Sequence, residues 1–172
     1  LDNDYIETVW WILKRFFDEG LIYESYKVLP YCPRCGTPLA SHEVAQGYIE
    51  ETVDSIYVTF KVKGKENEYL IVWTTTPWTL PSNVGVAVNP GATYVKVFHQ
   101  GNVYYVAKDR VSDLFEEDYQ IIEEFLGKDM EYLEYEQLFP FVVPECRSFI
   151  VTCANYVSTL EGTGLVHIAP AY

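Results

Sequence analysis

The chain has 172 residues, of which 49% are hydrophobic and 16% aromatic. Its 25 acidic residues outnumber its 12 lysines and arginines, which gives a formal net charge of −13. This length and composition predict one domain of ordinary size, with at most a small appendage, that can bury a sizeable core. The negative charge argues against a general phosphate-binding surface, so any nucleic-acid contact is expected to be local.

Targeting and membrane segments are not evident in the sequence. No apolar run approaches the length that crosses a bilayer. The chain starts at Leu1 with neither an initiator Met nor a signal-peptide pattern, and it reads as a piece of a longer protein. We therefore expect a cytoplasmic location, no membrane partner and a monomer.

The first predicted element is a helix over residues 4–19. Its apolar residues recur at helical spacing, an Asp or Asn at positions 2–4 can cap it, and Gly20 follows its end. Trp11, Ile12 and Phe16 widen the apolar stripe, so we expect this helix to pack on a partner. It lacks the basic polar face of a membrane-surface helix.

A Cys-x-x-Cys pair, Cys32 and Cys35, follows the helix and is closed by Gly36. Such a knuckle can present two thiolates to Zn²⁺, but a structural zinc site needs four ligands. His42 is a possible third ligand, although its spacing fits no standard pattern. A redox role has less support because no thioredoxin-like βαβ unit surrounds the pair. An unmetallated turn stays open as an alternative.

From Tyr48 onward, short strands separated by turns are predicted. The expected strands are residues 55–62, 69–74, 84–88, 93–98, 103–107, 139–143, 148–157 and 165–169. Hairpin turns are expected at 64–67 and 99–102, with His99 on the surface. Residues 108–125 are expected to form a helix with a solvated acidic face. The predicted fold class is β-rich α+β, a closed or partly closed β-barrel-like domain with one or two helices, preceded by the N-terminal helix and the Cys-x-x-Cys knuckle.

The first candidate site is residues 73–83, Trp-Thr-Thr-Thr-Pro-Trp-Thr-Leu-Pro-Ser-Asn. Pro77 is expected to end the preceding strand because it has no N–H, and it keeps the residue before it extended. Hydroxyls, an indole and an amide are thereby gathered at a strand end, where such groups can bind a polar ligand or order a water. A threonine-rich strand that ends at a proline turn also needs no function. The candidate ligand-binding residues are Thr74, Thr75, Thr76, Trp78, Thr79 and Asn83.

The second candidate site is His167, in the string Gly-Thr-Gly-Leu-Val-His-Ile-Ala-Pro over residues 162–170. The glycines allow another backbone or a ligand to approach closely. A lone His in an apolar run is more often a core residue. The sequence shows no nucleophile elbow around a serine and no glycine-rich phosphate-binding loop.

These two strings resemble the two signatures of the editing insert of isoleucyl-tRNA synthetase, in that family's order and at about its distance apart. The resemblance covers nearly all of the chain. Residues 1–47 resemble the connection to the synthetase core, and residues 48–172 resemble the editing domain. The valine and leucine relatives carry Thr-Thr-Arg-Pro where this chain has Thr74–Pro77 without an arginine, which favours the isoleucine enzyme.

The resemblance implies hydrolysis of the ester that joins valine to the terminal adenosine of the isoleucine tRNA. The implied partners are the 3′ end of that aminoacylated tRNA and the rest of the parent synthetase. The resemblance implies Thr79 and His167 as the catalytic residues: Thr79 would help position the water, and His167, with Trp78 nearby, would limit the pocket so that isoleucine clashes. Asn83 would hold the loop or touch the substrate. The terminal adenosine and the amino acid would be contacted by Thr74, Thr75 and Thr76.

The resemblance also bears on cofactors and on missing parts. Editing needs no cofactor, and ATP would be used by the parent because His-Ile-Gly-His and Lys-Met-Ser-Lys-Ser strings are absent here. In many isoleucine enzymes a second Cys-x-x-Cys completes a zinc ribbon, so Zn²⁺ at Cys32 and Cys35 would need ligands outside this chain. The family's aspartate for the substrate amino group would fall beyond Tyr172, so weak editing by this chain alone is expected.

A different class of function also fits the sequence. The domain and first helix could form a non-catalytic docking module, with the knuckle as part of a zinc ribbon. That hypothesis predicts that Thr79→Ala and His167→Ala change nothing in the parent. A zinc-ribbon module would hold about one tightly bound zinc per chain.

Overall fold

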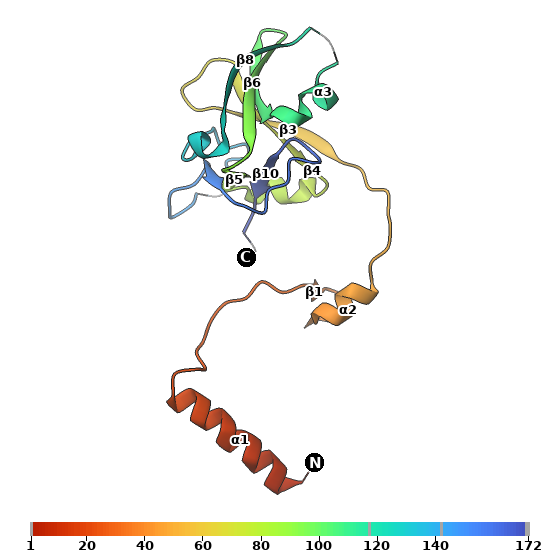
Figure 1. The fold of residues 1–172 in the computed structure, drawn as a ribbon, viewed down its shortest axis with the longest axis vertical. Coiled ribbons are helices and arrows are strands. Elements are labelled where there is room, and N and C mark those ends of the chain that lie inside the picture. The colour runs from red at the N-terminus through yellow and green to blue at the C-terminus, as the bar shows by residue number, and fades with distance from the viewer. Residues whose placement is uncertain (1, 117, 142, 171–172) are drawn as a thin grey trace. The chain divides into compact units, whose positions relative to one another are not determined.

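The computed structural model describes residues 2–116, 118–141 and 143–170 (Figure 1). The chain divides into two compact units, Leu1–Glu51 and Thr52–Tyr172. The second unit holds two β-sheets and several short helices. The elements of the first unit are α1 (Asn3–Asp18), β1 (Tyr31–Cys32), β2 (Thr37–Pro38) and α2 (Ser41–Gln46).

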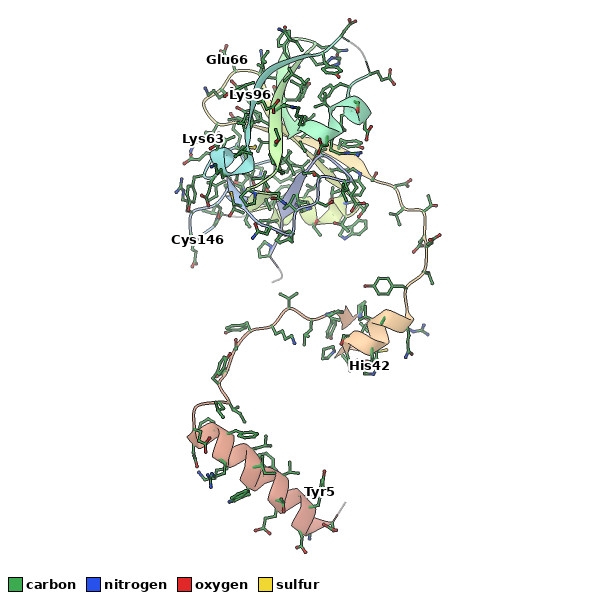
Figure 2. All side chains as sticks on the ribbon, in the orientation of Figure 1. Tyr5, His42, Lys63, Glu66, Lys96 and Cys146 are labelled. Atoms are coloured by element: carbon green, nitrogen blue, oxygen red, sulfur yellow. The ribbon has the colours of Figure 1, made fainter. Side chains whose placement is uncertain are left out.

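Helix α1 confirms the predicted helix to within a residue at each end. Asp2 caps it, because its Oδ1 accepts a hydrogen bond of 2.8 Å from the Tyr5 N–H. Gly20, with φ of 71°, follows the last turn. All sixteen residues of α1 are exposed, and Figure 2 shows their side chains, Tyr5 among them, standing out from the helix. Among the described residues, no helix combines the length and apolar content needed to cross a membrane.

The larger sheet of the second unit has five strands in the order β3-β4-β7-β6-β8. Strands β4 and β7 pair in parallel, and the other neighbours pair antiparallel. The predicted hairpin turns are present, with positive φ at Gly64 and Asn67 in one and at Gln100 and Gly101 in the other. The strands are β3 (Ile56–Lys61), β4 (Glu68–Thr74), β6 (Thr93–His99), β7 (Asn102–Ala107) and β8 (Gln120–Leu126).

The smaller sheet has three strands in the order β10-β5-β9. They are β5 (Gly85–Val88), β9 (Ile150–Cys153) and β10 (Leu165–Ile168), and Figure 1 shows β5 beside β10. The 3₁₀ helix η1 (Pro77–Ser82) connects β4 of the larger sheet to β5 of the smaller one. The two sheets pack on one core cluster, whose largest fully buried side chains include Phe60, Leu70, Tyr94, Tyr135 and Leu165.

The predicted helix over residues 108–125 is wrong. Of the residues described in this range, only η2 (Lys108–Arg110) and α3 (Val111–Leu114) are helical, and Phe115 already has extended backbone. The acidic stretch beyond it is the edge strand β8, where Glu123 and Glu124 pair with Lys96 and Lys108 at 2.6 and 2.7 Å. Helical spacing and strand spacing are hard to tell apart in a short segment, and here a lysine on the neighbouring strand and one on η2 stabilise the strand.

The β-rich α+β class is confirmed, but the closed one of the two expected barrel forms is not present, because the described residues form two sheets and no closed barrel. Residues 139–141 and 143 are not in a strand, and Val142 lies outside the described residues. The predicted strand 148–157 is confirmed only over β9. His99, expected on the surface, is half-buried at the end of β6 against the Phe115 ring.

Candidate active site

The threonine-rich stretch leaves the larger sheet where the sequence predicts. Strand β4 ends at Thr74, and Pro77 stands at the first position of η1, where its missing N–H costs nothing. Leu80 is buried and anchors η1 to the core. The hydroxyl groups thus follow one another from the end of β4 at Thr74 to Thr79 on η1, between the two sheets.

Three threonine hydroxyls of this stretch form a chain of short contacts. Thr74 Oγ1 lies 3.3 Å from Thr76 Oγ1, which lies 3.4 Å from Thr79 Oγ1. Thr74 Oγ1 also accepts a 3.1 Å hydrogen bond from the Thr76 N–H. Thr74 is buried, Thr76 is exposed and Thr79 is half-buried, so the chain begins in the core and its middle hydroxyl is open to solvent.

The chain ends on His167, which comes from the opposite end of the sequence. Its Nε2 lies 3.0 Å from Thr79 Oγ1. Strand β10 places it there by pairing antiparallel with β5, with His167 opposite Val86. The Val84 N–H also donates to the Ile168 carbonyl at 2.9 Å and fixes the strand's last residue. The two sequence strings therefore meet in one site.

The hydrogen bonds also assign the histidine tautomer. Thr79 donates its only hydroxyl hydrogen to the Thr76 carbonyl at 2.7 Å, so it accepts from His167 Nε2–H. The Nδ1 atom is then an acceptor, buried and without a hydrogen-bond partner among the described residues. Burial lowers the pKa of His167 below its usual value, so the imidazole is neutral at pH 7.

Asn83 is buried and its amide is fully engaged. Its Nδ2 donates to the Gly85 carbonyl at 2.9 Å and lies 3.5 Å from the Ile168 carbonyl. Its Oδ1 accepts from the Tyr135 hydroxyl at 2.5 Å. These contacts tie the end of η1 to the start of β5 and to Tyr135.

The family is shown by sequence comparison. A family model described as "tRNA synthetases class I (I, L, M and V)" matches residues 1–154. The chain belongs to the class I tRNA synthetases. It is 52% identical over 170 residues to an isoleucine–tRNA ligase of Clostridium tetani, covering 99% of this chain and 16% of that protein. It is 49% identical over 172 residues to that of Picrophilus torridus, covering all of this chain and 17% of that protein.

Two solved structures share the fold of this synthetase chain. GlLeuRS-CP1 matches with a TM-score of 0.57 at 16% identity, over 66% of this chain and 54% of that one. The P. knowlesi cytosolic leucyl-tRNA synthetase editing domain matches with a TM-score of 0.55 at 14% identity, over 71% of this chain and 60% of that one. The fold of an editing domain, expected from the sequence, is confirmed.

The remaining candidates of the synthetase chain lie close to the site in sequence but differ in contacts. Thr75 is half-buried next to the hydroxyl chain. Trp78 lies on η1 with 74% of its surface exposed, and its ring is free to meet a ligand. The structure brings Thr74, Thr76, Thr79 and His167 into one hydrogen-bonded group, and it leaves Trp78 on the open side of η1.

The Cys32–Cys35 turn of the synthetase chain is closed by two hydrogen bonds to Cys32. Cys35 donates its N–H to Cys32 Sγ at 3.3 Å, and Gly36, with φ of 69°, donates to the Cys32 carbonyl. Hydrogen bonds from the backbone N–H groups and from the Cys35 thiol lower the pKa of Cys32. The pKa of Cys35 rises, because its thiol hydrogen is donated to Cys32. Within the described residues, no group of three or more His, Cys, Asp or Glu side chains is placed to hold a metal. His42 therefore does not join Cys32 and Cys35 in such a group.

The sequence missed residues that support the site from a distance. Tyr135, which bonds Asn83, lay in an acidic stretch without a clear period. Arg110 holds the turn before β10, with Nε 3.1 Å from the Gly162 carbonyl and Nη1 3.2 Å from the Leu160 carbonyl. Both residues contact positions about fifty residues away, so no local sequence pattern could predict these contacts.

Proposed function

We propose that this chain is the editing module of an isoleucyl-tRNA synthetase and hydrolyses the ester that joins valine to the 3′-terminal adenosine of the isoleucine tRNA. The hydrogen-bonded group of Thr74, Thr76, Thr79 and His167 is the observation that carries this proposal. The name of the relatives, isoleucine–tRNA ligase, supports the isoleucine tRNA as the substrate. The fold shared with an editing domain supports hydrolysis of the ester as the reaction.

The need for such a module follows from the size of the amino acids. Isoleucyl-tRNA synthetase is the standard example: a pocket that accepts isoleucine gains only about 1–3 kcal/mol of discrimination from the one methylene that valine lacks. A second pocket that admits valine and rejects isoleucine corrects the error after transfer. The parent enzyme ligates isoleucine to its tRNA with ATP at a site outside this chain.

The chemistry asked of the site is modest because the ester is already reactive. A water must be held against the carbonyl, and donors must meet the developing oxyanion. The exposed Thr76 and half-buried Thr79 offer hydroxyl oxygens to such a water. Thr75 and Trp78 offer a hydroxyl and an exposed ring to the amino acid and the adenosine. No threonine acts as a covalent nucleophile, since none has an adjacent general base arranged to take its proton.

His167 serves as a fixed wall of the valine pocket. Its Nε2–H is committed to Thr79, which holds the ring in one orientation. A neutral imidazole also avoids repelling the substrate's α-ammonium group. Isoleucine's extra methylene meets this wall, whereas valine stops short of it.

The partners follow from the charge and from the size of the relatives. The chain spans about a sixth of the length of the isoleucine–tRNA ligases that it matches, so the rest of the synthetase is a partner. The net charge of −13 restricts tRNA contact to its 3′ end at the site. Cys32 and Cys35 would supply two of four zinc ligands, and the zinc would be structural. The cytoplasm is the proposed location.

The test is release of labelled amino acid from valyl- and isoleucyl-charged isoleucine tRNA by the full-length synthetase. Wild type should release valine selectively. Thr79→Ala and His167→Ala should each lower the rate of valine release, or raise the rate of isoleucine release, by about 10- to 100-fold. Matched controls are Thr59→Ala, an exposed strand threonine, and His99→Ala, a half-buried histidine outside the site.

Two outcomes would contradict the proposal. Wild-type enzyme that leaves valyl-tRNA intact lacks the activity altogether. Wild-type editing unaffected by Thr79→Ala and His167→Ala would make the threonine stretch structural. The second outcome would favour the docking module, for which the exposed apolar stripe of α1 is the supporting observation.

A further inference from the structure

Tyr135 is a buried residue that reaches the site from outside both sequence strings. Its side chain is 2% exposed, and its ring packs edge-on against Phe60 and Phe149 at centroid distances of 5.1 and 6.1 Å. Its hydroxyl donates to Asn83 Oδ1 at 2.5 Å. Burial raises the pKa of Tyr135, so the phenol stays protonated and remains a donor.

The backbone around Tyr135 is fixed by both sheets. Lys63 donates to the Glu134 carbonyl at 2.9 Å, and Glu136 donates to the Lys61 carbonyl at 2.8 Å, which ties the segment to β3. On the other side, Tyr135 donates to the Phe149 carbonyl at 3.0 Å, beside β9. The phenol is therefore presented from a segment that both sheets hold in place.

Asn83, which receives this hydrogen bond, sits between the two parts of the site. Its N–H donates to the Leu80 carbonyl at 3.0 Å and closes the last turn of η1. Its side-chain amide donates to Gly85 at the start of β5 and lies 3.5 Å from the carbonyl of Ile168, the neighbour of His167. Asn83 thus fixes the end of the helix that carries Thr79 relative to the strand that carries His167.

A strained residue supports the same corner. Phe149 has φ of 59°, a left-handed conformation that an aromatic residue adopts only when its surroundings impose it. In that conformation its N–H donates to the Val84 carbonyl at 2.7 Å while its own carbonyl accepts from Tyr135. The junction of η1 and β5 is thereby held through Asn83 and through Val84.

We propose that Tyr135 is a positioning residue of the editing site, acting through Asn83 on the Thr79–His167 pair. The proposal rests on the editing function proposed above. The phenol fixes the Asn83 amide so that its oxygen faces Tyr135 and its nitrogen faces Gly85 and Ile168. Without that donor the amide loses the partner that sets its orientation, and η1 can shift against β10.

The test compares Tyr135→Phe with Tyr105→Phe in the full-length synthetase. Tyr105 is also a buried core tyrosine, 5% exposed, whose hydroxyl donates to Glu68 Oε2 at 2.5 Å, but it lies outside the site. Tyr135→Phe should lower kcat for valyl-tRNA hydrolysis about tenfold with little change in KM, because the reacting groups move apart. Tyr105→Phe should edit like wild type, and isoleucine ligation should be unchanged in both.

A double-mutant cycle separates positioning from a general loss of stability. If Tyr135 acts through Asn83, the variant Asn83→Ala with Tyr135→Phe should edit no more slowly than Asn83→Ala alone. Additive losses, or wild-type editing by Tyr135→Phe, would overturn the inference. Failure of wild-type enzyme to release valine would instead count against the proposed function, so the two failures are distinct.

Discussion

At the scale of single residues, the directions of a few hydrogen bonds determine the tautomer of His167 in the site. Thr79 has one hydroxyl hydrogen and gives it to the Thr76 carbonyl, which obliges His167 to donate from Nε2. The residue types of this group could be predicted from the sequence, and all lie in its two strings. The tautomer and the buried Nδ1 could not, because they depend on a contact between residues 88 positions apart.

The lowered pKa of His167 predicts how stability depends on pH. An unfolded histidine titrates near pH 6.5, so between about pH 6.5 and the lower folded pKa the unfolded chain binds more protons than the folded one. Stability from this residue is therefore complete above about pH 6.5 and is lost as the pH falls below it. Urea unfolding at pH 7.5 and 5.5 should show a smaller acid loss for His167→Gln than for wild type.

The control for this measurement is His42→Gln, which changes an exposed histidine on α2. It should keep the pH dependence of wild type. Equal acid losses in wild type, His42→Gln and His167→Gln would mean that protonation of His167 costs the fold nothing, against the burial seen at Nδ1.

At the scale of elements, β10 is placed by the turn that precedes it. Gly164 has φ of 77°, and a Cβ there would lie 2.4 Å from Ala107 Cβ. Gly162, with φ of 64°, lies against the Trp73 ring. The backbone of this turn thus packs against both β7 and the end of β4. This packing fixes the position of β10, and therefore of His167, relative to Thr79.

Gly164→Ala should destabilise the fold by about 3 kcal/mol, since a left-handed backbone and a close contact both oppose the new methyl. Gly101→Ala is the matched control: its φ is 83°, but nothing lies within 4 Å of the added carbon. It should cost about 1 kcal/mol, from backbone strain alone. Urea denaturation of both variants measures the difference, and equal losses would show that the Ala107 contact is readily relieved.

The elements also show where sequence reasoning reaches its limit. Helix α1, the hairpins and the strand before Pro77 could be predicted because their periods, caps and turn residues are local. Strand β8 resembles a helix in the sequence because the partners of its acidic residues are distant, Lys96 on β6 for Glu123 and Lys108 on η2 for Glu124. The register break after Lys96, a β-bulge in the edge pair, further obscures the alternation.

At the scale of the whole molecule, the two units differ in how they are stabilised. The core clusters lie in the second unit, whereas residues 21–30 of the first are all exposed and in no helix or strand. Limited trypsin digestion should therefore cut first after Lys27. The peptide bond after Lys96, which pairs with Glu123 from the middle of β6, should resist cleavage for far longer.

Mass spectrometry of the early digestion products tests this prediction. A first cut within the sheets of the second unit would contradict it. A Glu-specific protease gives an independent check, because Glu50 and Glu51 are exposed in a segment without helix or strand. Cleavage there should release the second unit with its sheets intact.

The order of the smaller sheet has a consequence for how the chain emerges from the ribosome. Strand β5 is buried along its whole length, yet its two neighbours, β9 and β10, follow it only about 60 and 80 residues later in the chain. At usual elongation rates of about 5–20 residues per second, the roughly 80 residues between β5 and β10 delay pairing by about 4–16 s. During synthesis an apolar strand therefore stays unpaired for that time, and the Thr79–His167 contact forms only after β10 has been translated.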